Sequence, residues 1–324
     1  AELYKVVKFV AIGLAPLALV GIYESVTDNK LFAPMMQYCP WATDYVAENE
    51  IRWGLTRAYG PFSHCILFGC SFVIFFPLVF HLRYQGKNDR YFAYILCGFL
   101  ALGVISSMSS GSWVMLFVAI ACLILEKMKY LVKPILILTP IMILFIMIIS
   151  NRPFYHVVVS YMNPLSGSGW HRARMIDAAV ETFDQWWIAG YKGEDPGWGE
   201  YVGMSKSDIT NEFLFAGVVY GLAGIIALCT VLTSAFRTLI KSYQKAFDPV
   251  FKSLYWAFGT ALISIIFTWM SVSFFGQMMA IFYIFMGMLS SASDGKWLQR
   301  HLNFQIYASM QTENQLDLQK QEHF

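Results

Sequence analysis

Apolar residues gather along the chain in eight long runs, and polar and charged residues concentrate in the segments between them. A helix needs roughly 20 apolar residues to cross a bilayer, because its backbone groups must all bond within the segment. The runs approach that length and lack the strict alternation of membrane β-strands. We therefore predict an all-α, polytopic transmembrane helix bundle with about eight spans. They lie near 6–23, 62–82, 91–108, 112–127, 131–150, 211–235, 253–270 and 273–292.

Lysine and arginine concentrate in four segments that flank these runs, and eight spans would place all four segments on one side. The residues are Arg83, Lys87, Arg90, Lys127, Lys129, Lys133, Arg237, Lys241, Lys245, Lys252, Lys296 and Arg300. Short basic loops stay in the cytoplasm, so the long loops 24–61 and 151–210 are expected to face outward. Residues 1–293 then form a single transmembrane domain, followed by a polar cytoplasmic tail, 294–324.

Composition supports the membrane class. Hydrophobic residues make up 57% of the chain, charged residues 14%, and the mean hydropathy is +0.51. A soluble domain usually carries about 25% charged residues. The net charge of +2, without a basic tail or a basic–aromatic repeat, gives no reason to expect a nucleic-acid partner. The six cysteines are scattered and lack metal-site spacing.

The interiors of the runs hold almost no ionisable residues, and this directs attention to the loops. No Asp, Glu, Lys or Arg lies between Phe62 and Phe80, or from Ser253 to Ser293. Ion-coupled transporters and proton pumps usually place acids or histidines at membrane depth. The pattern therefore argues against transport and favours chemistry at the outer face.

Two arginines stand close to the outer end of the second run, in NEIRWGLTRAYGPFSHC (49–65). Arg52 and Arg57 lie there against the tendency of basic residues to remain on the cytoplasmic side. Their position indicates an anionic partner, which is a lipid phosphate, an acid of the other loop, or a substrate. A salt bridge or a lipid-headgroup contact explains either arginine equally well.

The second outer loop contains an apolar stripe at three- and four-residue spacing, which is typical of an amphipathic helix. The stripe lies in a helix predicted near 170–188 and consists of Met175, Ile176, Ala179, Val180, Phe183 and Trp187. Arg174 falls on its polar face and Arg172 on its apolar side. Such a helix is expected to lie along the outer membrane boundary, and a surface helix without catalysis is the plain alternative.

Residues 207–212 lead into the sixth run. Ser207 or Asp208 is predicted to cap this helix, with Asn211 and Glu212 in its first turn. Capping is therefore the ordinary explanation for Asp208.

Five segments, taken in order, have a counterpart in one family. They are GIYESVTDNKLF (21–32), RAYGPFSH (57–64), SSMSSGSW (106–113), HRARMIDAAVETFDQWWIAGYKG (171–193) and SDITNEFLFAGVVYGLAGI (207–225). Together they resemble the O-antigen ligase and polysaccharide polymerase family of bacterial membrane glycosyltransferases, over roughly residues 6–292. Thr210 stands where ligases usually have a histidine implicated in catalysis. Ser109–Ser110–Gly111 lacks the arginine that often occurs in the family's turn, and the missing histidine favours a polymerase-like member.

The resemblance implies a glycosyltransferase of the bacterial inner membrane with its large loops in the periplasm. Its donor would be a glycan on undecaprenyl pyrophosphate, and its acceptor another glycan or the lipid-A core, among membrane lipids. The departing lipid pyrophosphate carries several negative charges, which arginines stabilise through bidentate hydrogen bonds. With no cluster of carboxylates in the sequence, arginines would replace Mg²⁺, and no cofactor is expected.

The resemblance also implies roles for particular residues. Arg57 and Arg172 match the family pattern and form the expected catalytic pair. Arg52 and Arg174 are further candidates for substrate binding.

A general base would help the acceptor hydroxyl to attack by accepting its proton. Asp208 and His171 are equal candidates for this base, ahead of Glu212 and Asp177. Asn211 is expected to orient a sugar or phosphate oxygen. Trp170 is a candidate for stacking on a sugar face, although interfacial anchoring explains it more simply.

Two other functions compete with this one. A flippase or exporter of lipid-linked oligosaccharides needs a wide polar pathway, against which the uncharged span interiors argue. A non-catalytic assembly subunit stays open because the expected histidine is missing. Convergence of Arg57, Arg172 and Asn211 on one outward site would favour the enzyme.

Overall fold

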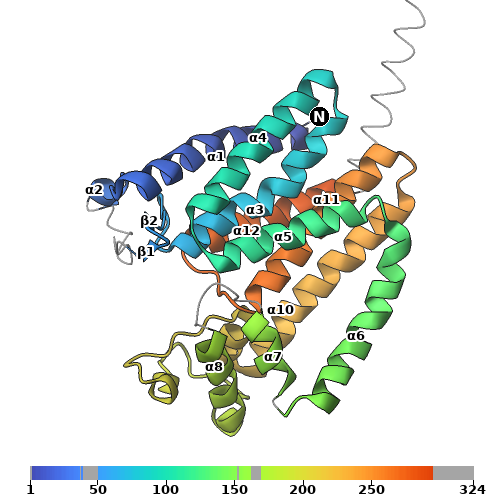
Figure 1. Cartoon of the computed structure of the whole chain (residues 1–324). Helices are drawn as coiled ribbons and strands as arrows, with labels where there is room; N and C mark the ends of the chain where they lie inside the picture. The colour runs from blue at the N-terminus through green and yellow to red at the C-terminus, as the bar shows by residue number, and fades with distance from the viewer. Residues whose placement is uncertain (1, 37, 39–49, 152, 162–168, 295–324) are drawn as a thin grey trace, which may run out of the picture.

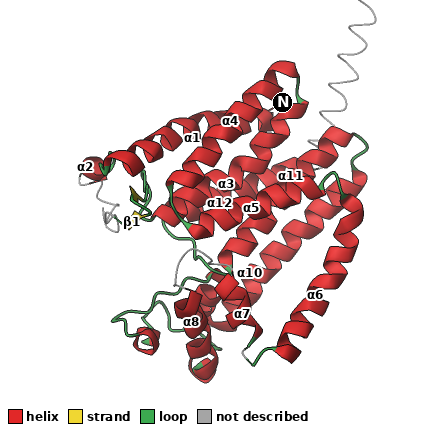
Figure 2. Ribbon diagram, viewed as in Figure 1, coloured by secondary structure: helices red, strands yellow, loops and turns green. Residues whose placement is uncertain are grey.

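The computed structural model describes the chain except for residues 1, 37, 39–49, 152, 162–168 and 295–324. Cys39 and the predicted polar tail beyond Asp294 therefore lie outside the described residues. In the described part, twelve α-helices, three short 3₁₀-helices and one two-stranded hairpin form the fold (Figures 1 and 2). The elements are α1 (Glu2–Thr27), α2 (Ala33–Met36), β1 (Ile51–Arg52), β2 (Leu55–Thr56), α3 (Cys65–His81), η1 (Leu82–Tyr84), α4 (Lys87–Ser106), α5 (Ser110–Leu125), η2 (Lys129–Leu131), α6 (Val132–Ile149), α7 (Phe154–Tyr161), α8 (Gly169–Glu181), α9 (Phe183–Trp186), η3 (Trp198–Val202), α10 (Glu212–Lys245), α11 (Pro249–Trp269) and α12 (Gln277–Ser293).

All eight predicted runs are helical, but among the described residues six helical segments are long and apolar enough to cross a membrane. They comprise α1, α3 with η1, α4, η2 with α6, α10 and α11. The other two runs form α5 and α12, which have 16 and 17 residues. At about 1.5 Å per residue these helices are about 24–26 Å long, somewhat shorter than a typical hydrocarbon core.

The helix α3 forms the centre of the bundle, packed against α4, α5 and α11. It is apolar around its whole circumference, and nearly all of its residues are buried. Glycines let neighbouring helices approach it closely: a Cβ built on Gly103 of α4 would lie 2.6 Å from the Phe72 ring. In contrast, α6 has no buried residue and stands apart from the bundle (Figure 1).

The described basic segments, which follow α3, α5 and α10, lie at one end of the bundle. Arg83 lies 3.5 Å from Glu126, which joins the end of α3 to the end of α5. Lys129 donates to the Tyr243 hydroxyl over 2.8 Å, which joins the start of α6 to the end of α10. The hairpin and α8 lie toward the other end (Figure 1).

The segment before α3 departs from the all-α prediction. Ile51 pairs with Thr56 in an antiparallel hairpin. Its turn residues Trp53 and Gly54 have φ of 52° and 79°, a pair of positive values typical of a tight hairpin turn. The hairpin is the only sheet in the described residues, so the chain is mostly helical rather than strictly all-α.

The predicted amphipathic helix 170–188 is divided in two. It stops at Thr182, whose φ of −103° and ψ of 21° leave the helical region, and α9 follows. Met175 and Ala179 are buried as expected, whereas Val180 and Phe183 are exposed. The predicted apolar stripe was therefore only partly right, because the break turns α9 and brings Trp186 against Ala179. The Nε1 of Trp186 donates to the Ala179 carbonyl over 2.8 Å.

A break in α10 fixes this loop to the bundle. Gly221 interrupts the helix with φ 68° and ψ −162°. The loop after α9 bonds to the interrupted backbone: Leu222 N donates to Trp187 O over 2.9 Å, and Tyr191 N donates to Val218 O over 2.5 Å. These two bonds replace helical ones and hold α8 and α9 beside α10.

Candidate active site

The five family-like segments lie toward the hairpin end of the bundle, and direct contacts join several of them. The Ser106 carbonyl accepts bonds from Ser25 Oγ at 2.8 Å and from Ala58 N at 3.0 Å. These bonds unite the exit of α1, the segment before α3 and the serine-rich turn before α5. Gln277 at the start of α12 donates to Pro61 O over 3.1 Å, which adds a segment that sequence reasoning did not include.

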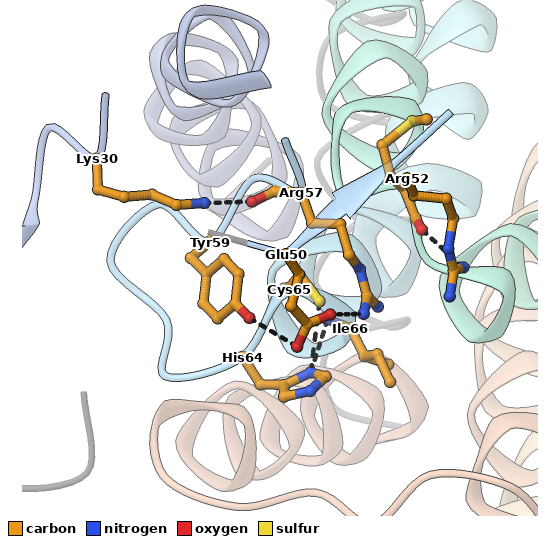
Figure 3. Close-up of polar contacts among 9 residues, drawn as sticks. Lys30, Glu50, Arg52, Arg57, Tyr59, His64, Cys65 and Ile66 are labelled. Atoms are coloured by element: carbon orange, nitrogen blue, oxygen red, sulfur yellow. Dashed lines mark hydrogen bonds and ion pairs between the residues drawn. The ribbon is translucent and has the colours of Figure 1, made fainter. Parts of the chain in front are cut away.

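Arg57 is buried and already paired (Figure 3). Its Nη1 donates to the Glu50 carboxylate, and the Tyr59 hydroxyl donates to the same carboxylate over 3.2 Å. Burial opposes ionisation of Glu50, but the Arg57 guanidinium outweighs it and holds the pKa of Glu50 below its usual range. The Arg57 carbonyl accepts from Lys30, and its Nε is buried without a partner among the described residues. Arg57 is thus a fixed charge in the wall of the site.

Arg52 strengthens the same wall. Its Nη1 donates to the Met108 carbonyl over 2.9 Å, linking the hairpin to the serine-rich turn. Met108 has φ 46°, an uncommon conformation for a residue other than glycine. Burial, and then the charge of Arg57, lower the pKa of Arg52, so two guanidinium groups stand close together here.

Arg172 is the arginine best prepared to receive a ligand. It is buried on α8, and its Nε donates to Thr210 Oγ1 over 3.2 Å. Its two Nη groups have no partner in the part of the chain that the structure describes. Burial lowers the pKa of Arg172 to about 10, against the opposing charge of Asp208, and the group stays cationic at neutral pH. Thr210 fixes one edge of the guanidinium and leaves the outer edge for an anion.

His64 feels the charge of both arginine segments. It caps α3: its Nδ1 accepts from Ile66 N over 3.1 Å, so the neutral ring carries its proton on Nε2 (Figure 3). Burial lowers the pKa of His64, and the charges of Arg57, Glu50, Asp208 and Arg172 all act on the ring. One imidazole is therefore within electrostatic reach of both arginines expected from the resemblance.

The start of α10 differs from the expected cap. Asn211 is the capping residue: its Oδ1 accepts from Leu214 N over 3.0 Å, and its Nδ2 donates to Met270 O over 3.1 Å. The prediction that Ser207 or Asp208 caps the helix was wrong, because Asn211 is placed one residue before the first helical turn. Asn211 thus holds the site together, and Asp208 is exposed beside it.

The remaining candidates on α8 point elsewhere. Arg174 lies 5.9 Å from the Trp170 ring and 3.7 Å from Asp177. Residues 170 and 174 share a helix face, from which residue 172 is rotated by about 200°. Trp170 and Arg174 are therefore not brought to Arg172. His171 has a buried Nε2 without a partner among the described residues, and no hydrogen bond or ion pair within the described part of the chain joins it to Arg57 or Asp208.

Sequence reasoning missed three side chains near this end. Glu50 and His64 stand in the quoted arginine-containing segment, where the position of His64 just before an apolar run was the available signal. Trp53 is 63% exposed at the hairpin tip, and its ring lies 5.7 Å from that of Trp113. The exposed ring of Trp53, backed by the half-buried Trp113, is a surface on which a sugar ring can stack.

The described residues contain no group of three or more His, Cys, Asp or Glu placed to hold a metal ion. Comparison of the sequence with protein-family models and with curated proteins finds no match. The geometry of the site is therefore the ground on which a function is proposed.

Proposed function

We propose that this chain is a membrane glycosyltransferase of the bacterial inner membrane. It transfers or polymerises glycan units from a polyprenyl-pyrophosphate-linked donor at the outer, periplasmic face. The observation that best supports this proposal is the buried guanidinium of Arg172. Thr210 orients it, and its charge and that of Arg57 both act on His64. Such an arrangement favours a multiply charged anion, which matches the diphosphate of the donor.

The residues support a displacement at the anomeric carbon. The acceptor hydroxyl attacks that carbon, its C–O bond to the diphosphate breaks, and the electron pair leaves with the lipid pyrophosphate. The two Nη groups of Arg172 and the Nε2–H of His64 donate to the departing phosphate oxygens. Arg52 raises the local positive potential, whereas the charge of Arg57 is balanced by Glu50 and holds the wall of the site in place. Asp208, exposed beside Arg172, accepts the proton of the acceptor hydroxyl.

A polymerase suits these residues better than a ligase. Thr210 occupies the position at which the resembled ligases carry a histidine. Its hydroxyl accepts from Arg172, so this position orients a cation and supplies no base. We infer that a growing glycan is the acceptor.

The experiment is incubation of the purified chain, in nanodiscs, with a lipid-linked glycan donor. Separation of the products by length gives a ladder for a polymerase and a single added unit for a ligase. Folded protein that yields no product from donors of several glycan compositions would contradict the enzymatic proposal and favour an assembly subunit.

Replacement of His64 tests its role as a donor separately from its role as a cap. His64→Asn keeps a good capping residue but removes the Nε2 donor, so transfer should fall at least about tenfold with little change in stability. His64→Ala should additionally lower the free energy of unfolding by about 1 kcal/mol. Transfer rate and thermal midpoint are measured on the same preparations. If His64→Asn transfers at the wild-type rate, His64 acts only as a helix cap and its Nε2–H takes no part in transfer.

Acidification should destabilise the wild-type chain through His64. Its folded-state pKa lies below the ordinary value of 6.5, so the unfolded chain binds the proton more readily. The contribution of the neutral His64 ring to the free energy of unfolding is fully present above pH 6.5 and is lost as the pH falls from there toward the folded-state pKa. The thermal midpoint, compared at pH 7.5 and pH 5.5, should drop more for wild type than for His64→Asn. Equal drops would show that His64 does not contribute.

A further inference from the structure

A cavity of about 190 Å³ lies at the end of the bundle opposite the candidate active site. It opens between the ends of α10 and α12 and the first turns of α11. Its lining includes Thr238, Lys241, Ser242, Lys245, Ser293 and Asp294. None of these residues takes part in the proposed reaction.

The lining offers hydrogen-bond donors suited to a phosphate. Lys241 and Lys245 are four residues apart on α10 and so share a face, on which the hydroxyl of Ser242 also contributes. The Oγ of Ser293 is fully buried and has no partner among the described residues. With Asp294 as the one lining acid, two lysines minus one aspartate give a net charge of +1. Ammonium and hydroxyl groups around a small hollow fit a singly charged phosphodiester.

The position of the cavity fits the depth of lipid headgroups. From the break at Gly221 to Lys245, α10 contains residues 221–245, a length of about 37 Å against a hydrocarbon core of about 30 Å. With the break at Gly221, to which the outer loop after α9 bonds, taken as the outer boundary, the last turns of α10 project into the headgroup layer. Phe247, two residues after Lys245, is 96% exposed, as suits an aromatic anchor at that boundary.

We propose that this cavity binds the phosphate of an anionic phospholipid in the leaflet at the basic end. The volume accommodates a headgroup phosphate and excludes the acyl chains, which would lie along the exposed Ile240 on the outside of α10. Basic hollows between membrane helices are suited to such headgroups. Lys241 and Lys245 are exposed at the rim of the cavity, from which their ammonium groups can reach the phosphate. The site is separate from the proposed transfer reaction and does not depend on it.

The test is native mass spectrometry of the purified full chain with phosphatidylglycerol, phosphatidylcholine or inorganic phosphate. The variant is Lys241→Gln/Lys245→Gln. The matched control is Lys87→Gln/Lys127→Gln, which removes two lysines from the same end but outside the cavity. Phosphatidylglycerol should bind wild type and control with equal affinity, and the cavity variant at least about tenfold more weakly. Phosphatidylcholine should bind all three weakly.

Equal phosphatidylglycerol affinity in the cavity variant and its control would overturn the proposal. Complete displacement of phosphatidylglycerol by millimolar inorganic phosphate would overturn the lipid as occupant and assign the cavity to the free ion. Should the double variant fail to fold, Ser242→Ala serves in its place, with an expected weakening of about threefold. An unchanged affinity in that variant would count against the site.

Discussion

Arg172→Lys is expected to lower glycan transfer by at least about 100-fold while leaving membrane insertion and abundance unchanged. Removal of one preorganised donor to a developing anion typically lowers the rate by about 10²–10³-fold. A lysine keeps the charge but presents a point donor that cannot both bond to Thr210 and offer two further N–H groups in one plane. Initial rates of transfer from a lipid-linked donor give the measurement.

Arg174→Lys is the matched control for this prediction. It makes the same chemical change two residues away, on the exposed face of α8 that carries Trp170. Its transfer rate should stay within about twofold of wild type. If Arg172→Lys retains more than half of the wild-type rate, or if both variants fall equally, the planar donor at Arg172 is not what drives the reaction.

Gly221→Ala is expected to destabilise the chain by about 3 kcal/mol or more and to abolish transfer. Gly221 has φ 68° and ψ −162°, a region open essentially to glycine alone. A Cβ there would also lie 2.6 Å from Ile188 O and 2.9 Å from Ala189 N, both backbone atoms that cannot move aside independently. The loop after α9 would separate from α10, and α8 would no longer hold Arg172 beside Thr210.

Gly13→Ala and Gly287→Ala are the controls, since a Cβ at either position meets nothing within 4 Å. Within a helix, alanine in place of glycine stabilises by about 0.5–1 kcal/mol, so both controls should keep or raise the thermal midpoint. The measurement is the midpoint in detergent, together with the transfer rate. A Gly221→Ala midpoint equal to that of the controls would mean that the break in α10 is not required.

Hydrophobic patterning predicts the bundle well and its irregular parts poorly. The long apolar runs give every major helix, because a segment that must satisfy its own backbone bonds in lipid has few alternatives. Basic residues predict which helix ends lie together. The break at Gly221 leaves no trace in hydropathy, since apolar residues continue through it, and only bonds to Trp187 and Tyr191 make it stable.

The arginines of the candidate site could be singled out from the sequence, whereas their partners could not. Arg52 and Arg57 stand out because they lie at the outer end of an apolar run, and Arg172 is singled out by the family resemblance. Glu50 pairs with Arg57 through a hairpin whose turn uses a tryptophan at positive φ, which residue preferences do not indicate. His64 is missed because histidine is not among the preferred capping residues. Asn211 was expected to touch substrate, yet both of its polar groups bind the protein.

The most direct test of the central claim is the affinity of a short polyprenyl diphosphate, such as farnesyl pyrophosphate, for wild type, Arg172→Gln and Arg174→Gln in detergent. Wild type and Arg174→Gln should bind the diphosphate with the same affinity, and Arg172→Gln at least about tenfold more weakly. Equal affinity in all three proteins would contradict an anion site built around Arg172.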